Sequence, residues 1–436
     1  MAIISGNSGG QALDGGPEND VITGFGGDDQ LTGGGGNDIF AYPERLFGDD
    51  LITDFTPGQD RIDLSALGIA DFATLRPFMI ETGGNCTIEF FYNGAFESIT
   101  IEGVARSQLS ASDFIFNAST TAFSPAPTLS DDLLFGGNGD DALSGDAGDD
   151  TLVSGAGSDT LNGGAGFDTL TSGSGSDVFA YTARQFDGDV ITDFVQGSDR
   201  INLSAFGVAD LATLAPFIVQ NGADSVISLF FNGEIETITI KGILPNQLTA
   251  SDFIFNAATT AVMPTSSALD DVLFGGNGAD TLNGGPGDDT LVGGNEVDRL
   301  DGGQGDDKLT GGAGADTLVG GIGLDTLTGG SESDVFHFNA RRFDDDVITD
   351  FALGVDRINL SLLGIADLAT LLPFMRESAG NTLIEFGFGG VSESITINGV
   401  LPAALAASFS EPHRPVLARL QRNRWTFCLA VSVPIR

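Results

Sequence analysis

The apolar residues of this chain follow two patterns that alternate along its length. In residues 15–41, 136–180 and 275–337, one apolar residue returns every ninth position, in the unit G-G-x-G-x-D-x-U-x with U apolar; the blocks hold three, five and seven copies. Between them, alternating stretches such as "RIDLS" and "TIEFFYNGAFESITIEG" predict short strands and hairpins. The chain is therefore predicted to be all-β.

The nonapeptide predicts a parallel coil with two repeats, or 18 residues, per turn. Glycines at positions one, two and four permit positive φ and tight turns, and the x-U-x portion is expected to form a three-residue strand. Repeat n then lies over repeat n+2, and the apolar residues stack inside the coil. In the third block this stack comprises Leu282, Leu291, Leu300, Leu309, Leu318 and Leu327.

A longer unit follows each glycine block and begins at Asp50, Asp189 and Asp346. It reads D-x-I-x-D-F-x-x-G-x-D-x-I-[D/N]-L-S. In the first copy we expect a short helix from Asp71 and a hairpin around Asn93-Gly94. Successive copies lie 139 and 157 residues apart, so their spacing differs by 18 residues, which is one turn of the predicted coil.

The two patterns divide the chain into seven segments. Roll 1 is 1–41, module 1 is 42–118, roll 2 is 127–180, module 2 is 181–258, roll 3 is 266–337, module 3 is 338–409, and an atypical basic tail is 410–436. Weak repeats at 127–135 and 266–274 lead into rolls 2 and 3.

Charge narrows the range of partners. The chain has 61 acidic and 18 basic residues and a formal net charge of -43, which argues against nucleic acid and anionic membranes and favours cations. No apolar run approaches the roughly 20 residues of a membrane span. The start, "MAIISGNSGG", lacks the features of a secretory signal peptide. Cys86 and Cys428 are the only cysteines, and we expect no disulfide between them.

One buried leucine for every nine residues is too little to order the coil, because backbone ordering costs roughly 1–2 kcal/mol per residue. In the predicted coil the aspartates stack, and stacked carboxylates repel unless a cation lies between them. Carboxylates and glycine carbonyls form an all-oxygen ligand set that suits Ca²⁺.

The predicted calcium ligands are therefore the sixth-position aspartates, with backbone carbonyls beside them. The aspartates are Asp20, Asp29, Asp38, Asp132, Asp141, Asp150, Asp159, Asp168, Asp177, Asp271, Asp280, Asp289, Asp298, Asp307, Asp316, Asp325 and Asp334. The predicted carbonyl ligands are Gly137, Gly139, Gly164, Gly166, Gly276, Gly278, Gly285, Gly287, Gly303, Gly305, Gly312 and Gly314.

These repeats resemble the RTX (repeats-in-toxin, haemolysin-type) family, whose nonapeptides form a calcium-filled parallel β-roll. Some copies depart from the pattern. Glu18, Glu296 and Glu332 replace the fourth-position glycine, and Ser154 and Ser172 replace the first. We expect weaker or missing sites at those turns.

The longer module resembles the region beside the β-roll in the C-terminal domain of serralysin-type secreted metalloproteases. That resemblance implies export by a type I secretion apparatus. The H-E-x-x-H zinc helix of those proteases is not found, and His337 and His413 lie in unrelated contexts.

The sequence therefore predicts a non-enzymatic, calcium-binding protein, extracellular or on the cell surface, that folds on binding Ca²⁺ after export. Two alternatives remain. The chain could be the noncatalytic repeat portion of a secreted protease or polysaccharide epimerase or lyase, since the R-modules of alginate epimerases are similar. It could also be an adhesin or carbohydrate-binding protein that uses Phe90, Phe91 and Tyr92, although core packing is the favoured interpretation of that cluster.

Two smaller questions also stay open. Asp54, Asp60, Asp193, Asp199, Asp350 and Asp356 are interpreted as turn-capping acids, with an extra calcium site as the alternative. The last residues, "FSEPHRPVLARLQRNRWTFCLAVSVPIR", match neither pattern. A shifted reading frame would explain them, and resequencing the locus would test that hypothesis.

Overall fold

The computed structural model describes residues 1–119, 121, 125–258, 266–339, 342–365, 367–388 and 390–408. The predicted basic tail, 410–436, lies outside the described residues, as do His413 and Cys428. The chain forms two compact units. Unit 1 contains Met1–Asn202, Ile218–Ser228 and Glu236–Ile254; unit 2 contains Leu203–Phe217, Leu229–Ile235 and the described residues from Phe255 onward.

Roll 1 and module 1 share two sheets, with strand orders β1-β3-β5-β7-β11 and β2-β4-β6-β10-β9-β8. Their strands are β1 Ile3–Ser5, β2 Ala12–Asp14, β3 Val21–Thr23, β4 Gln30–Thr32, β5 Ile39–Ala41, β6 Asp49–Ile52, β7 Arg61–Asp63, β8 Met79–Thr82, β9 Asn85–Tyr92, β10 Ala95–Ile101 and β11 Phe114–Ile115.

Roll 2 and module 2 repeat this arrangement, with orders β12-β14-β16-β18-β22-β21-β20 and β13-β15-β17-β19-β23. Their strands are β12 Leu133–Gly137, β13 Ala142–Ala147, β14 Thr151–Gly157, β15 Thr160–Ala165, β16 Thr169–Gly175, β17 Val178–Ala180, β18 Gly188–Ile191, β19 Arg200–Asn202, β20 Ile218–Asn221, β21 Asp224–Phe231, β22 Glu234–Ile240 and β23 Phe253–Ile254.

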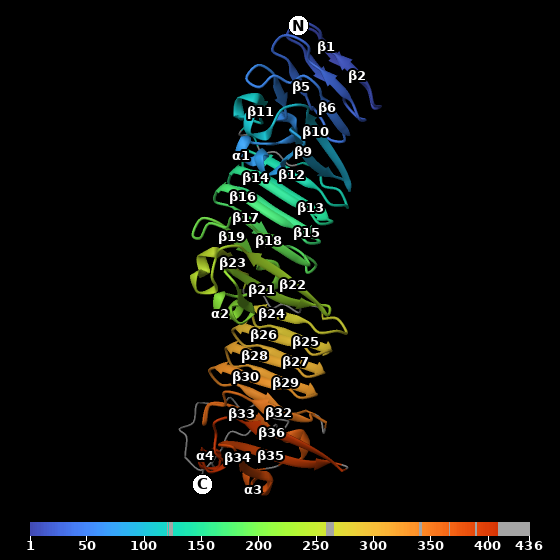
Figure 1. The fold of residues 1–436 in the computed structure, drawn as a ribbon. Helices are drawn as coiled ribbons and strands as arrows, with labels where there is room; N and C mark the ends of the chain where they lie inside the picture. The colour runs from blue at the N-terminus through green and yellow to red at the C-terminus, as the bar shows by residue number, and fades with distance from the viewer. Residues whose placement is uncertain are drawn as a thin grey trace. The chain divides into compact units, whose positions relative to one another are not determined.

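Roll 3 and module 3 form the sheets β24-β26-β28-β30-β32-β36-β35-β34 and β25-β27-β29-β31-β33 in unit 2. Their strands are β24 Val272–Gly276, β25 Thr281–Pro286, β26 Thr290–Asn295, β27 Arg299–Gln304, β28 Lys308–Ala313, β29 Thr317–Ile322, β30 Thr326–Ser331, β31 Val335–His337, β32 Asp345–Ile348, β33 Arg357–Asn359, β34 Met375–Ser378, β35 Asn381–Phe388 and β36 Val391–Ile397. Strands β24, β26, β28 and β30 follow one another like rungs (Figure 1).

The helices are short and belong to the modules. The α-helices are α1 Phe72–Leu75, α2 Leu211–Leu214, α3 Leu368–Leu371 and α4 Pro402–Ser408. The 3-10 helices are η1 Ser65–Leu67, η2 Arg76–Phe78, η3 Arg106–Gln108, η4 Ala111–Asp113, η5 Ser204–Phe206, η6 Ala215–Phe217, η7 Pro245–Gln247, η8 Ala250–Asp252, η9 Ser361–Leu363 and η10 Leu372–Phe374. None of the helices in the described residues is long and apolar enough to cross a membrane.

The predicted 18-residue register is confirmed. Leu300 pairs with Leu318, and Thr317 pairs with Val335, in parallel strands. The six predicted core leucines of roll 3 are at most 1% exposed. The strands of roll 1 have the predicted three residues. Most strands of rolls 2 and 3 are longer, because backbone pairing continues into the glycine pair; Gly312, for example, pairs with Gly330.

The module elements predicted from sequence are also present. Asp71 Oδ1 accepts a hydrogen bond from the Thr74 amide at 2.8 Å and so begins helix α1. Strands β9 and β10 form the predicted hairpin, with Asn93 and Gly94 at positive φ.

The module strands extend the roll sheets by backbone pairing. In unit 2, β30 pairs with β32, and β32 pairs with β36. The predicted boundary after residue 337 therefore marks a change of sequence pattern within continuous sheets. One hydrophobic core runs from the stacked leucines into module 3, where Phe343 and Ile395 belong to it.

Candidate metal-binding ladder

The seventeen predicted aspartates are all buried, at most 3% exposed. Consecutive members of a column lie 18 residues apart and are joined by a hydrogen bond. The amide of Asp298 donates to Asp316 Oδ1 at 2.8 Å, and the amide of Asp316 donates to Asp334 Oδ1 at 2.9 Å. The first carboxylate oxygen thus caps the turn of the preceding coil.

The second carboxylate oxygen has no such partner. Within the described residues, Oδ2 is buried and accepts no hydrogen bond in twelve of the predicted aspartates. These are Asp20, Asp29, Asp150, Asp159, Asp168, Asp177, Asp289, Asp298, Asp307, Asp316, Asp325 and Asp334. A buried carboxylate oxygen without a donor costs free energy, and its repetition along the coil indicates an absent positive partner.

The position-one glycines complete a cradle around these oxygens. A Cβ built on Gly311 would lie within 3.0 Å of both Asp316 Oδ2 and the Gly329 carbonyl oxygen. Gly302 faces Asp307 Oδ2 and the Gly320 carbonyl in the same way. At these turns Oδ2 therefore points to a space that is also lined by a peptide carbonyl of the next coil.

This arrangement corrects the sequence-based account of the glycines. Ten of the twelve predicted carbonyl-donor glycines have positive φ, the exceptions being Gly139 and Gly278. Position-one residues such as Gly311 do not, so glycine is required there by the close carboxylate and carbonyl rather than by φ. The carbonyls seen beside Oδ2 are those of position one, which the prediction omitted.

Burial raises the pKa of the ladder carboxyls. The pKa of Asp150 and Asp307 rises to about 8, and that of Asp298 and Asp334 to about 7. Desolvation is the largest cause; neighbouring carboxylates add to it, and the backbone hydrogen bonds oppose it. Without a cation, the fold disfavours the ionised ladder.

The residues fit a calcium ion by their chemistry. Carboxylate and carbonyl oxygens are hard ligands, which Ca²⁺ accepts in flexible geometry. Within the described residues, no three His, Cys, Asp or Glu side chains converge on a point that could hold a metal. Backbone carbonyls would therefore supply many of the ligands.

Family comparison gives the same assignment. The RTX calcium-binding nonapeptide repeat matches in four copies, at residues 5–40, 265–300, 292–327 and 301–336, and the peptidase M10 serralysin C-terminal family matches residues 130–265. The chain contains RTX repeats and a serralysin-type C-terminal module. These calcium-binding repeats agree with the all-β fold of stacked parallel coils that the structure shows.

Solved structures show more distant likeness. The R2 and R3 subunits of the Azotobacter vinelandii mannuronan C5-epimerase AlgE6 are 26% and 25% identical; the matches cover 32% and 31% of this chain and 93% and 79% of those, with TM-scores of 0.27 and 0.21. The extracellular lipase LipA of Serratia marcescens is 19% identical over 57% of this chain and 39% of its own, with a TM-score of 0.26. No curated protein matches.

Three further aspartates join the ladder although the nonapeptide did not predict them. Asp50, Asp189 and Asp346 are at most 2% exposed, and their Oδ2 atoms also accept no hydrogen bond. Asp346 Oδ1 accepts from the Asp325 amide at 3.0 Å, and burial raises its pKa to about 9. Each lies in a D-x-I triplet that matches D-x-U of the RTX repeat. The D-x-I triplet was the sequence signal from which these three aspartates could have been predicted as ladder residues.

Two predicted ligands have other partners. Asp132 Oδ1 accepts from the Asn93 amide at 2.7 Å, and its Oδ2 accepts from the Thr128 amide. Asp271 has the same environment in unit 2, with Asn232 and Ser267 as donors. These acids cap the first coil of a roll against the preceding module, and their role as ligands stays a prediction.

The module acids also act as caps. Asp54 accepts from the amides of Gly33 and Gly34 at 2.8 and 2.7 Å, and Asp60 accepts from Asp38 and Thr56 at 2.9 and 2.8 Å. This supports the turn-capping interpretation of both and of their copies.

The aromatic cluster proposed for surface binding is packed. Phe90 is 7% exposed, and Arg45 lies over the Tyr92 ring at 4.8 Å. The cavity beside them is about 10 Å³, less than a ligand needs. Core packing therefore accounts for Phe90, and Phe91 is half-buried against the same core.

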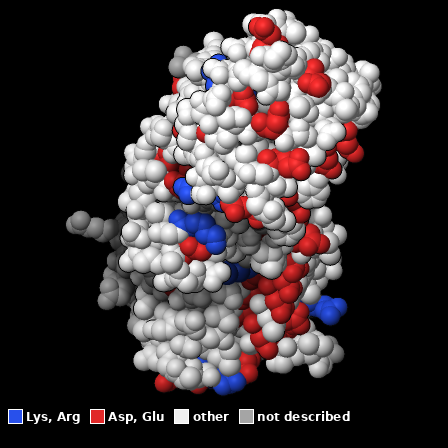
Figure 2. All heavy atoms as spheres, turned by 45° about the horizontal axis from the view of Figure 1, so that its top comes forward, with Lys and Arg blue, Asp and Glu red and all other residues white. Residues whose placement is uncertain are grey.

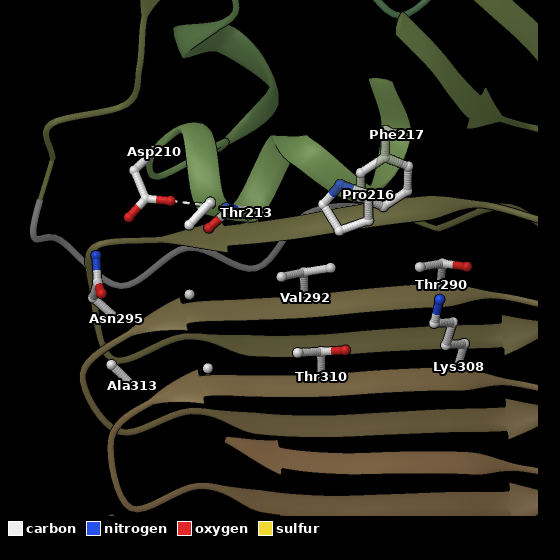
Figure 3. Close-up of a pocket in the computed structure, with 13 residues that line it drawn as sticks. Asp210, Thr213, Pro216, Phe217, Thr290, Val292, Asn295, Lys308, Thr310 and Ala313 are labelled. Carbon is white, nitrogen blue, oxygen red and sulfur yellow. Dashed lines mark hydrogen bonds between the residues drawn. The ribbon is translucent and has the colours of Figure 1, made fainter. Parts of the chain in front are cut away.

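A larger groove lies in unit 2, between the α2–η6 segment and the outer face of roll 3. Its volume is about 300 Å³, and Pro216, Phe217 and Val292 form an apolar wall beside Thr290 and Lys308 (Figure 3). Lys308 is exposed. On the face shown in Figure 2, acidic side chains far outnumber basic ones.

The raised pKa values predict the pH dependence of the calcium-free rolls. The folded-state pKa exceeds the unfolded value, so the folded chain binds more protons between about pH 4 and pH 8, and its stability falls as pH rises through that window. We expect calcium-stripped protein to show more β signal in far-ultraviolet circular dichroism at pH 5 than at pH 8, because protonated carboxyls are cheaper to bury. The trend should persist in 1 M salt, because salt screens exposed charges far more than these buried carboxyls. A folded fraction that rises with pH would contradict the prediction.

Proposed function

We propose that this RTX protein is exported through a type I-like apparatus and that its rolls fold outside the cell by binding several Ca²⁺ ions. The observation that carries the proposal is the column of buried Asp Oδ2 atoms without donors, several of which, such as those of Asp307 and Asp316, face a carbonyl of the next coil. A cation at each step would compensate both oxygens at once.

The ladder also supplies a reason for folding only where calcium is abundant. The carboxylates of a column are buried, and each follows the previous one by 18 residues in sequence. Without cations, neighbouring carboxylates of the column raise one another's pKa. Sub-micromolar calcium would leave weak sites empty, whereas millimolar calcium would fill sites with dissociation constants near 10⁻⁴ M. Such a protein would stay loosely structured inside the cell and fold after export.

We further propose that the chain is not itself an enzyme and that its seven segments are the functional divisions. The family matches describe repeat and C-terminal regions, which support this role. They are equally consistent with the noncatalytic portion of a secreted protease or polysaccharide-modifying enzyme. A surface-binding role is favoured by the groove beside Phe217, which has room for a small ligand.

Substitution of one central ligand tests the proposal. Asp316→Asn keeps the Oδ1 acceptor for Asp298 but replaces Oδ2 with an amide. We expect at least one fewer Ca²⁺ per chain in equilibrium dialysis. Removal of one buried charge should also stabilise the calcium-stripped protein.

Asp301→Asn is the matched control. Asp301 pairs with Arg299 at 3.3 Å and also interacts electrostatically with His337, so this variant removes the same charge outside the ladder. Its calcium content should equal that of the wild type. Equal calcium content in Asp316→Asn would count against the ladder as the binding site.

A further inference from the structure

Roll 2 differs from roll 3 at two position-one residues. Ser154 and Ser172 stand where roll 3 has Gly311 and Gly329, in the last two turns of one edge. Both serines are fully buried, at 0% exposure. The other edge of roll 2 keeps glycine, at Gly145 and Gly163.

At a glycine turn, two oxygens face an open space. A Cβ on Gly145 would come within 3.0 Å of Asp150 Oδ2 and of the Gly163 carbonyl oxygen. Asp150 Oδ2 accepts no hydrogen bond. The space therefore holds no side chain and is lined by acceptors alone.

At the serine turn, a side chain takes that space. Ser154 Oγ donates to the Ser172 carbonyl oxygen at 2.7 Å, which is the carbonyl equivalent to Gly163 O. The same hydroxyl lies beside the Asp159 carboxyl, where it lowers a pKa that burial raises more strongly. The hydroxyl thus takes the carbonyl that would hold a cation, and the Ser154 side chain fills the position that glycine leaves open at the other turns, although Asp159 Oδ2 itself keeps no hydrogen-bond partner among the described residues.

The geometry points to a serine plug: Ser154 replaces the calcium ion at the Asp159 turn, so that roll 2 lacks a site there which roll 3 has. Ser172 holds the same position-one place before Asp177, but its Oγ has no hydrogen-bond partner in the part of the chain that the structure describes, so the plug is assigned to Ser154 alone. A hydroxyl proton satisfies the carbonyl, and the Cβ and Oγ atoms exclude an ion. This inference rests on the proposed calcium ladder and specifies which turns use it.

The consequence is an asymmetric roll. At Asp150 and Asp168, position one is glycine and leaves room for an ion beside Oδ2. Asp159 and Asp177 also have Oδ2 atoms without a hydrogen-bond partner in the described chain, but a serine side chain stands at their position one. On the opposite edge, the Ser154 to Ser172 hydrogen bond joins consecutive coils without an ion. The position-one residue is therefore a determinant of how many ions each roll takes.

Reciprocal substitutions test this plug in the full-length chain. Ser154→Gly should bind one more Ca²⁺ per chain than the wild type in equilibrium dialysis with saturating calcium. Gly311→Ser, which installs the plug in the matching turn of roll 3, should bind one fewer. Ser154→Ala removes the hydroxyl but keeps the Cβ, and its calcium content should not rise.

The outcomes separate this inference from the proposed function. A wild-type chain that binds no calcium would overturn both. A wild type that binds several ions, with unchanged calcium content in Ser154→Gly or in Gly311→Ser, would overturn the plug alone. Far-ultraviolet circular dichroism in calcium identifies a variant that fails to fold, and the other variant then decides.

Discussion

Raising free calcium from below 1 µM to several mM is expected to produce a cooperative gain of β signal in far-ultraviolet circular dichroism, with its midpoint above about 0.1 mM. The rolls contribute most of the parallel strands, and most repeats bury a single large apolar side chain in the coil, such as Leu300 or Leu309. Their order should therefore depend on ions rather than on apolar burial.

The expected magnitude is large because the sites add. A site with a dissociation constant near 10⁻⁴ M contributes about 1.4 kcal/mol at 1 mM calcium. Summed over a ladder of this length, that gain is comparable with the stability of a whole domain, about 5–15 kcal/mol. The transition should also be steep, because each coil pairs with the next.

Magnesium is the control for ionic strength and divalent charge. Mg²⁺ demands near-ideal octahedral geometry and keeps its waters, which a cradle of mixed carbonyls and carboxylates does not offer. We expect little change up to several mM magnesium. A full β spectrum in chelator would show that the coils do not need the ion.

Replacing a position-two glycine is expected to be the most damaging single change in a roll. Gly312 has φ +110°, and a Cβ there would collide with the Gly294 carbonyl oxygen of the preceding coil. Gly312→Ala therefore combines the cost of positive φ, about 1–3 kcal/mol, with displacement of a neighbouring backbone. We expect a lower midpoint of urea unfolding in saturating calcium, by more than strain alone would cause.

Gly380→Ala isolates the strain component. Gly380 lies in the same unit with φ +85°, and nothing lies within 4 Å of the added Cβ. The loss of stability in Gly380→Ala should stay within the range expected for positive φ alone, about 1–3 kcal/mol. Equal losses of stability in Gly312→Ala and Gly380→Ala would show that the close approach of the coils at Gly312 does not contribute to stability.

Much of the roll could be predicted because its residues repeat at a fixed period. The 18-residue register followed from the spacing of D-x-U, and stacking of Leu300 on Leu318 followed from the register. The stacking of the aspartates 18 residues apart followed as well. No structural knowledge beyond coil geometry was needed for these features.

The missed features depend on contacts between coils. Asp346 lies 21 residues after Asp325 instead of 18, because a loop separates the last repeat from the module, and a fixed period overlooks it. The role of Gly311 depends on a carbonyl from the next coil. The donors to Asp132 come from the preceding module and the weak leading repeat, which period alone does not place.

Continuous pairing from β30 through β32 to β36 has a consequence for the order of assembly. The module end of the sheet buries aromatic and aliphatic side chains such as Phe343 and Ile395, which need no ion to pack. It can therefore present a finished strand edge as a template. The coil next to the module therefore forms its first parallel pair on an ordered strand, which lowers the entropic cost of that step. The remaining coils then add one at a time toward the N-terminal end of the roll, so the roll grows in one direction.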